Sequence, residues 1–153
     1  MGTRILLVGC GKMGGALLGG WLAGDIAAAD VTIVEPFAGD AVAQRFGVTV
    51  VDEVGRVAAG FVPDIVAFAV KPQNMDDILS LYRPFVRPET VFLSIAAGRT
   101  IASFEQHLGT EAAIIRTMPN TPAAIGRGIT VACANAPVRE AQRTLAHGLL
   151  EAV

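Results

Sequence analysis

The chain has 153 residues, close to the usual size of one domain, and hydrophobic residues make up 52% of it. A formal charge of -2, from 12 basic and 14 acidic residues with no basic run, argues against nucleic acid as a partner. No segment reaches the ~18 apolar residues of a membrane span and two cysteines cannot build a disulfide framework, so we expect a soluble, cytoplasmic protein without membrane contact.

Short apolar runs of strand length alternate with longer segments of helical spacing. The predicted strands are residues 5–8, 31–34, 65–70, 91–95, 114–115 and 129–132. The predicted helices are residues 13–23, 38–46, 75–82 and 101–108. Strands that alternate with helices indicate βαβ units, and continuous apolar strands indicate a sheet covered on both faces. We therefore predict an α/β fold with a doubly wound, mostly parallel sheet flanked by helices.

A last helix is predicted over residues 138–150, where Pro137 precedes a run of strong helix formers. The chain then ends at residues 151–153 without a capping glycine or proline. We expect residues 1–137 to form one domain, and residues 138–153 to be the start of a helix that leads into a second, helical domain absent from this sequence.

A G-x-G-x-x-G motif directly follows the first predicted strand and opens the first predicted helix. Its residues are Gly9, Cys10, Gly11, Lys12, Met13 and Gly14. We expect Gly9 to permit a tight turn, Gly11 to let the backbone touch a pyrophosphate, and Gly14 to allow close packing of helix on strand. Free N–H groups at the helix start would face the anion. The motif predicts a Rossmann-like domain that binds NAD or NADP.

Glu35 ends the second predicted strand, about 20 residues after the glycine motif, where a ribose partner is expected. A carboxylate there accepts hydrogen bonds from the ribose 2′-hydroxyl and repels a 2′-phosphate, so Glu35 favours NAD over NADP. The alternative is a solvated glutamate at a strand end. Lys12 could offset pyrophosphate charge, or it could simply be an exposed lysine.

Three later strand ends carry unusual sequences. They read A-V-K-P-Q at residues 69–73, S-I-A-A-G at residues 94–98, and R-T-M-P-N-T-P-A at residues 116–123. In an open parallel sheet, ligands bind beyond the carboxyl ends of the strands. Together with the glycine motif, and in this order over essentially the whole chain, these segments resemble the pyrroline-5-carboxylate reductase family.

This resemblance implies a reductase that passes hydride from NAD(P)H to the C=N bond of 1-pyrroline-5-carboxylate, giving L-proline. It implies that residues 9–13 cradle the pyrophosphate. It further places Ala69, Val70, Lys71 and Pro72 beside the adenosine and ribose, and Ala96, Ala97 and Asn120 near the nicotinamide.

The residue types at these positions suit such contacts. Pro72 fixes its own backbone angle and biases Lys71 toward an extended conformation, so these two residues form a rigid backbone surface beside the cofactor. Ala96 and Ala97 have little side chain, so a flat ring can approach the backbone. The alternatives are a surface lysine at Lys71 and an ordinary Pro-Asn turn at Asn120.

Members of the family normally continue into a helical second domain that forms the dimer and most of the substrate pocket. The resemblance therefore implies a homo-oligomer when that domain is present. Residues 52–56 lack the asparagine that the family tends to carry there, which removes one expected adenosine contact. We expect this chain by itself to bind dinucleotide and to turn over little or no substrate.

Catalytic and metal-binding residues are not assigned. His107 and His147 lie in predicted helices away from the strand ends, and no Cys/His cluster suggests a metal. Two further interpretations stay open. One is a stand-alone NAD(H)-binding module without activity. The other is a different β-hydroxyacid-dehydrogenase-like oxidoreductase, such as a relative of prephenate dehydrogenase or a deazaflavin-dependent enzyme.

Overall fold

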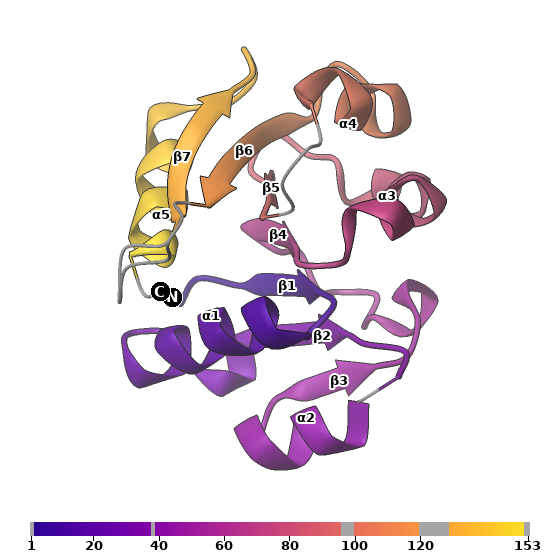
Figure 1. Ribbon diagram of the computed structural model, residues 1–153, viewed down its shortest axis with the longest axis vertical. Coiled ribbons are helices and arrows are strands. Elements are labelled where there is room, and N and C mark those ends of the chain that lie inside the picture. The colour runs from indigo at the N-terminus through magenta and orange to yellow at the C-terminus, as the bar shows by residue number, and fades with distance from the viewer. Residues whose placement is uncertain (1, 38, 96–99, 120–128, 152–153) are drawn as a thin grey trace.

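One mixed sheet organises the molecule (Figure 1). The computed structural model describes residues 2–37, 39–95, 100–119 and 129–151. Within these residues the strand order is β3-β2-β1-β4-β5-β6-β7, and every neighbouring pair is parallel except β6 and β7. The strands are β1 (Ile5–Val8), β2 (Val31–Val34), β3 (Thr49–Val51), β4 (Ile65–Phe68), β5 (Val91–Ser94), β6 (Ala113–Pro119) and β7 (Ile129–Ala134).

Helices cover both faces of this sheet. They are α1 (Lys12–Ala23), α2 (Gly39–Phe46), α3 (Pro72–Leu79), α4 (Ile101–Leu108) and α5 (Glu140–Leu150), with short 3-10 turns η1 (Ala28–Asp30), η2 (Val54–Arg56) and η3 (Ser80–Phe85). Buried side chains of α1, α2 and α5 pack on one face, and those of α3, η3 and α4 pack on the other. The predicted Rossmann-like, doubly wound, mostly parallel sheet is confirmed.

The strands are apolar along their whole length because helices cover both faces of the sheet. In β1, Ile5 and Leu7 belong to the core on the α1 side, whereas Leu6 and Val8 belong to the core on the α3 side. All four are at most 2% exposed. A strand whose successive side chains are buried on opposite faces needs no polar positions, which is why its sequence does not alternate.

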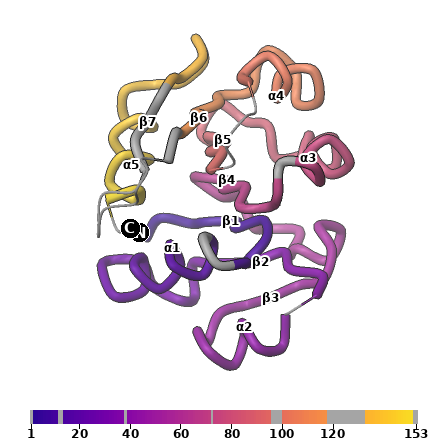
Figure 2. The backbone as a smooth tube through the Cα atoms, viewed as in Figure 1, coloured from indigo at the N-terminus to yellow at the C-terminus, as the bar shows by residue number. Residues whose placement is uncertain are grey.

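The path of the chain creates a switch point beside β1 (Figure 2). From β1 the chain moves outward through β2 to β3, and then returns to β4 on the other side of β1 before moving through β5 to β6. Connections on the two sides of β1 therefore diverge at the carboxyl ends of β1 and β4. Ligands of open parallel sheets bind in such a crevice.

Several predicted boundaries were wrong. β3 was not predicted, because its three residues are only half-buried or exposed at the sheet edge and give no apolar run. The strand predicted over 65–70 ends at Phe68. The helix predicted over 75–82 instead starts at Pro72, a favourable residue in a first helical turn, and gives way to η3 after Leu79. The short strand predicted at 114–115 extends over Ala113–Pro119.

The last helix packs against the first. The indole Nε1–H of Trp21 donates to the carbonyl of Leu149 at 2.9 Å, and Ala146, Leu149 and Leu150 are buried in the same core as α1. Residues 140–150 are thus part of the packed unit that contains the sheet. The second domain expected beyond them stays a prediction. Among the described helices, none combines the length and apolar content needed to cross a membrane.

Candidate functional site

The glycine motif lies at the switch point, between the ends of three strands. The N–H of Gly9 donates to the carbonyl of Val34 at 2.8 Å, which joins the motif to β2. The N–H of Ala69 donates to the carbonyl of Val8 at 2.8 Å, which joins the segment after β4 to β1. The predicted cofactor segments after β1, β2 and β4 are therefore neighbours at one edge of the sheet.

Gly9 and Gly14 are required by the backbone geometry. Gly9 has φ +84°, and a Cβ there would lie 2.8 Å from Cγ1 of Val70. A Cβ on Gly14 would lie 2.9 Å from the carbonyl oxygen of Gly9 and 3.3 Å from Cβ of Ala69. The tight turn expected at Gly9 and the close helix packing expected at Gly14 are both present.

Gly11 faces open space at the start of α1. A Cβ on Gly11 would have no heavy atom within 4 Å, in contrast to Gly9 and Gly14. Gly11 is the N-cap residue of α1, has no side chain to occupy the first N–H groups, and is followed by no acidic residue in the first turn. The positive end of the helix dipole and these N–H groups form a cradle that fits a pyrophosphate.

Glu35 is fixed beside this cradle by two backbone donors. Its Oε1 accepts from the N–H of Cys10 at 2.9 Å, and its Oε2 accepts from the N–H of Phe37 at 2.9 Å. The residue is buried, with 9% of its surface exposed. Each carboxylate oxygen has more than one acceptor site, so these bonds leave acceptor capacity for a ribose hydroxyl.

The thiol of Cys10 lies in the same environment. Burial raises the pKa of Cys10, and the nearby charge of Glu35 raises this pKa further, while Arg45 lowers it. Both shifts that raise it disfavour a thiolate, since desolvation and a like charge each penalise the anion. Cys10 therefore contributes its backbone N–H to the loop rather than a reactive sulfur.

The segment after β4 adopts the stiff geometry expected from its proline. Lys71 is the N-cap residue of α3, with φ -64° and ψ 143°, and Pro72 follows it in the first helical turn. The Lys71 side chain is exposed, whereas Val70 packs under Gly9. Three other predicted cofactor residues, Ala96, Ala97 and Asn120, lie outside the described residues.

The first residues of the two later segments of the predicted site are brought together by strand pairing. Ser94 in β5 is the register partner of Arg116 in β6. The hydroxyl of Thr117 donates to the carbonyl of Ser94 at 2.7 Å, and Nε of Arg116 is buried with no hydrogen-bond partner among the described residues. Ser94 and Arg116, the first residues of these two segments, thus lie side by side on adjacent strands.

A cleft of about 740 Å³ beside Glu35 was not predicted. Phe37 and an exposed ion pair, Arg56 Nε to Asp52 Oδ1 at 3.0 Å, are among the residues at its walls. The described residues that line it are Glu35, Pro36, Phe37, Gly39, Asp40, Ala41, Ala43, Val50, Val51, Asp52 and Arg56. The sequence feature that could have indicated this cleft is Phe37, an aromatic residue two positions after the expected ribose partner.

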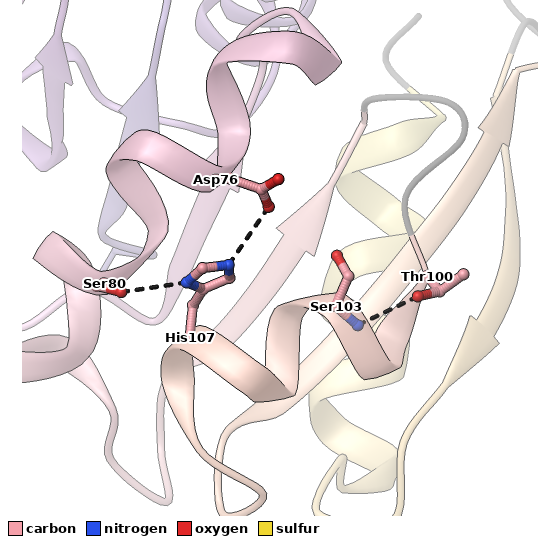
Figure 3. A network of polar contacts seen from close by, with 5 residues as sticks. All are labelled: Asp76, Ser80, Thr100, Ser103 and His107. Carbon is pink, nitrogen blue, oxygen red and sulfur yellow. Dashed lines mark hydrogen bonds and ion pairs between the residues drawn. The ribbon is translucent and has the colours of Figure 1, made fainter.

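A separate polar network joins α3 and η3 to α4 (Figure 3). His107 Nδ1 lies 3.2 Å from Ser80 Oγ, and His107 Nε2 lies 3.3 Å from Asp76 Oδ1. Although this order resembles a hydrolytic triad, Ser80 and Asp76 are exposed and none of the three lines the cleft beside Glu35. We interpret the network as a contact that holds these helices together.

The remaining histidine and the acidic residues offer no metal centre in the part of the chain that is described. His147 Nε2 on α5 pairs with Glu151, the C-cap residue of that helix, at 3.0 Å, and both side chains are largely exposed. The described residues contain no group of three or more His, Cys, Asp or Glu side chains that could hold an ion.

Comparison with known proteins places the chain among oxidoreductases. The model of a family described as "NADP oxidoreductase coenzyme F420-dependent" matches residues 4–98. The pyrroline-5-carboxylate reductase of Pseudomonas aeruginosa is 38% identical over 152 residues, which cover 98% of this chain and 55% of that protein. The chain spans about half the length of the curated relatives it matches.

Two solved structures show the same fold. A pyrroline-5-carboxylate reductase from Coxiella burnetii aligns with a TM-score of 0.86 and 24% identity, over all of this chain and 57% of that one. The pyrroline carboxylate reductase of Plasmodium falciparum, solved with NADP bound, aligns with a TM-score of 0.79 and 24% identity, over 98% of this chain and 55% of that one.

Proposed function

Since the chain belongs to the family described as NADP oxidoreductase, coenzyme F420-dependent, and the curated relatives it matches are pyrroline-5-carboxylate reductases, we propose that it is the dinucleotide-binding half of such a reductase. The observation that carries this proposal is the cradle at the switch point. Gly9 and Gly14 leave no room for a side chain, whereas Gly11 faces open space at the start of α1.

The residues of the chain bind and orient the cofactor. Backbone N–H groups at the start of α1 hold the pyrophosphate, and Glu35 accepts a hydrogen bond from a ribose hydroxyl. We further propose that Lys71 and Pro72 line the adenosine and ribose side. The resemblance to the reductases extends this proposal to Ala96, Ala97 and Asn120 as contacts of the nicotinamide. When bound, the reduced dinucleotide supplies a hydride for the C=N carbon of 1-pyrroline-5-carboxylate, and the protein supplies position and electrostatics.

We propose NAD as the preferred cofactor. Glu35 is a buried carboxylate whose two oxygens are held by the N–H groups of Cys10 and Phe37. A 2′-phosphate placed within reach of this carboxylate would meet a fixed like charge, whereas a 2′-hydroxyl can donate to it. Arg56 lines the same cleft but is paired with Asp52.

The complete reaction is proposed for a longer protein. Positioning of the substrate contributes a large part of catalysis, since effective molarity terms reach roughly 7–11 kcal/mol. We propose that the residues that contact 1-pyrroline-5-carboxylate, and the homo-oligomer interface, belong to a second domain. We also propose that the protein works in the cytoplasm. The 153-residue chain then binds dinucleotide with little or no turnover.

Calorimetric titration of the purified chain with NADH and NADPH tests this proposal, followed by cofactor oxidation with 1-pyrroline-5-carboxylate. NADH should bind without measurable oxidation. Gly11→Leu should abolish binding, because its side chain would enter the open space at the cradle. The control is Gly148→Ala on α5, whose added Cβ also meets nothing within 4 Å. Binding of neither dinucleotide by the wild-type chain, or turnover typical of complete reductases, would contradict the proposal.

A second candidate is favoured by the description of the matching family, which names coenzyme F420. In this alternative the electron partner of the bound nicotinamide is a deazaflavin. The match to that family ends at residue 98, whereas the match to the Pseudomonas reductase covers 98% of the chain, including most or all of the 116–123 segment. Reduction of F420 by NADPH in the presence of the chain would favour this alternative.

A further inference from the structure

Phe37 is an aromatic side chain without apolar cover. It is 94% exposed, and Leu81 is the other large hydrophobic residue of the described chain that is exposed. Aromatic rings contribute large apolar surfaces, so exposure of one beside a cleft points to a missing contact partner. Phe37 lines the cleft of about 740 Å³ next to Glu35.

The backbone of Phe37 is tied to the proposed ribose partner. Its N–H donates to Oε2 of Glu35 at 2.9 Å, while Oε1 of the same carboxylate accepts from Cys10 in the glycine motif. One buried carboxylate therefore fixes both the cradle and the residue that carries the exposed ring. The position of Phe37 relative to a bound ribose is set by this carboxylate.

The other walls of the cleft suit a flat heterocycle. Val50 and Val51 contribute apolar surface, while Asp52 and Arg56 form an exposed ion pair. An adenine ring has two apolar faces and polar edges, and its faces stack on aromatic side chains regardless of hydrogen bonding at the edge. A phosphate alone has no apolar face with which to cover the Phe37 ring.

We propose that Phe37 is the stacking platform for the adenine of the bound dinucleotide. This inference rests on the proposed function and assigns a residue outside the glycine motif. In the dinucleotide the adenine is attached to the ribose carbon next to the one that bears the 2′-hydroxyl. A carboxylate that accepts from this hydroxyl therefore has the base close by, and Phe37, two residues after Glu35, lines the cleft beside that carboxylate.

The test compares Phe37→Ala and Phe37→Trp with the wild-type chain, using calorimetry with NADH and with ADP-ribose. Phe37→Ala should weaken both ligands by the same factor, about tenfold to a hundredfold, because both contain the adenosine half. Phe37→Trp should retain wild-type affinity. Leu81→Ala, which removes the other exposed apolar side chain, should leave both affinities unchanged.

A fluorescence measurement adds a signature that a structural role would not produce. The chain has a single tryptophan, Trp21, which is 2% exposed in the core. A second indole at position 37 should be quenched on addition of ADP-ribose, whereas the emission of the wild-type chain should not change.

The outcomes separate the inference from the proposed function. Wild-type binding of NADH together with unchanged affinity in Phe37→Ala overturns the inference alone. Loss of affinity in both Phe37 variants also overturns the inference. The same holds if the tryptophan emission of Phe37→Trp does not change on addition of ADP-ribose. A wild-type chain that binds neither NADH nor NADPH overturns the proposed function and this inference together.

Discussion

The carboxylate of Glu35 accepts the backbone N–H of Cys10 at 2.9 Å, and this bond joins the end of β2 to the glycine motif after β1. The same carboxylate accepts the N–H of Phe37 at 2.9 Å. Its charge is thus held at a defined place beside the cradle. Glu35 therefore links the proposed choice between NAD and NADP to the geometry of the glycine motif. Substitution of Glu35 tests both.

Glu35→Gln should shift the cofactor preference toward NADPH. The amide has nearly the same shape but no charge, so the like-charge penalty on a 2′-phosphate disappears. We expect the ratio of the NADPH Kd to the NADH Kd to fall by about tenfold or more, as measured by calorimetry. The substitution should also cost about 1–3 kcal/mol of stability, since one part-buried N–H loses its acceptor.

The matched control is Glu140→Gln, which removes the same charge from the exposed first turn of α5. This variant should keep the wild-type ratio, because its charge is far from the cradle in the fold. An unchanged ratio in Glu35→Gln would show that Glu35 does not set the preference.

Glu35→Gln should also make Cys10 easier to alkylate. Burial raises the pKa of this thiol, and the charge of Glu35 raises it further, so removal of the charge lowers the pKa and increases the thiolate fraction at a given pH. The midpoint of the alkylation rate against pH should therefore move to lower pH. The measurement uses a Cys133→Ser background, in which Cys10 is the only cysteine. A midpoint that stays in place or rises would contradict the electrostatic coupling.

Gly9→Ala should destabilise the chain more than Gly47→Ala does. Both glycines have positive φ, +84° and +68°, and each substitution costs roughly 1–2 kcal/mol for this backbone conformation. At Gly9 the new Cβ would also meet Val70 at 2.8 Å, whereas at Gly47 it would meet nothing within 4 Å. We expect an additional loss of about 1–3 kcal/mol at Gly9 from this overlap, measured by urea unfolding. Equal losses in the two variants would show that Val70 moves aside freely.

The sequence was sufficient for the buried strands of the sheet and for the glycine motif, because both depend on local signals. Continuous apolar runs such as residues 5–8 indicate a buried parallel strand in any context. The three glycines of the motif lie where a strand gives way to a helix, and two of them have the predicted roles in packing and turn geometry. Family resemblance added the order of the later segments, whose first residues, Ser94 and Arg116, are register partners in β5 and β6.

What the sequence could not supply depends on contacts between distant residues. β3 is only three residues long and half-exposed at the sheet edge, so its formation depends on pairing with β2 rather than on its own pattern. The cleft beside Glu35 combines residues from the loop after β2, from α2 and β3, and from the segment that includes η2, and no spacing in the chain predicts their meeting. The bonds from Cys10 and Phe37 to Glu35 likewise depend on how two separate loops are placed.

Trp21→Phe should loosen α5 from the sheet before it affects the cofactor site. The indole Nε1–H of Trp21 donates to the buried carbonyl of Leu149 at 2.9 Å, across the interface of α1 and α5. Phenylalanine keeps most of the apolar contact but leaves this carbonyl without its donor, which costs about 1–3 kcal/mol. Hydrogen exchange should become faster in α5 than in β1, because α5 would open separately from the central strands.

Leu81→Ala, at an exposed side chain, should change stability by no more than about 0.5 kcal/mol. Uniformly faster exchange in Trp21→Phe would instead mean that α5 and the sheet unfold as one unit, so that α5 is as integral to the domain as its central strands.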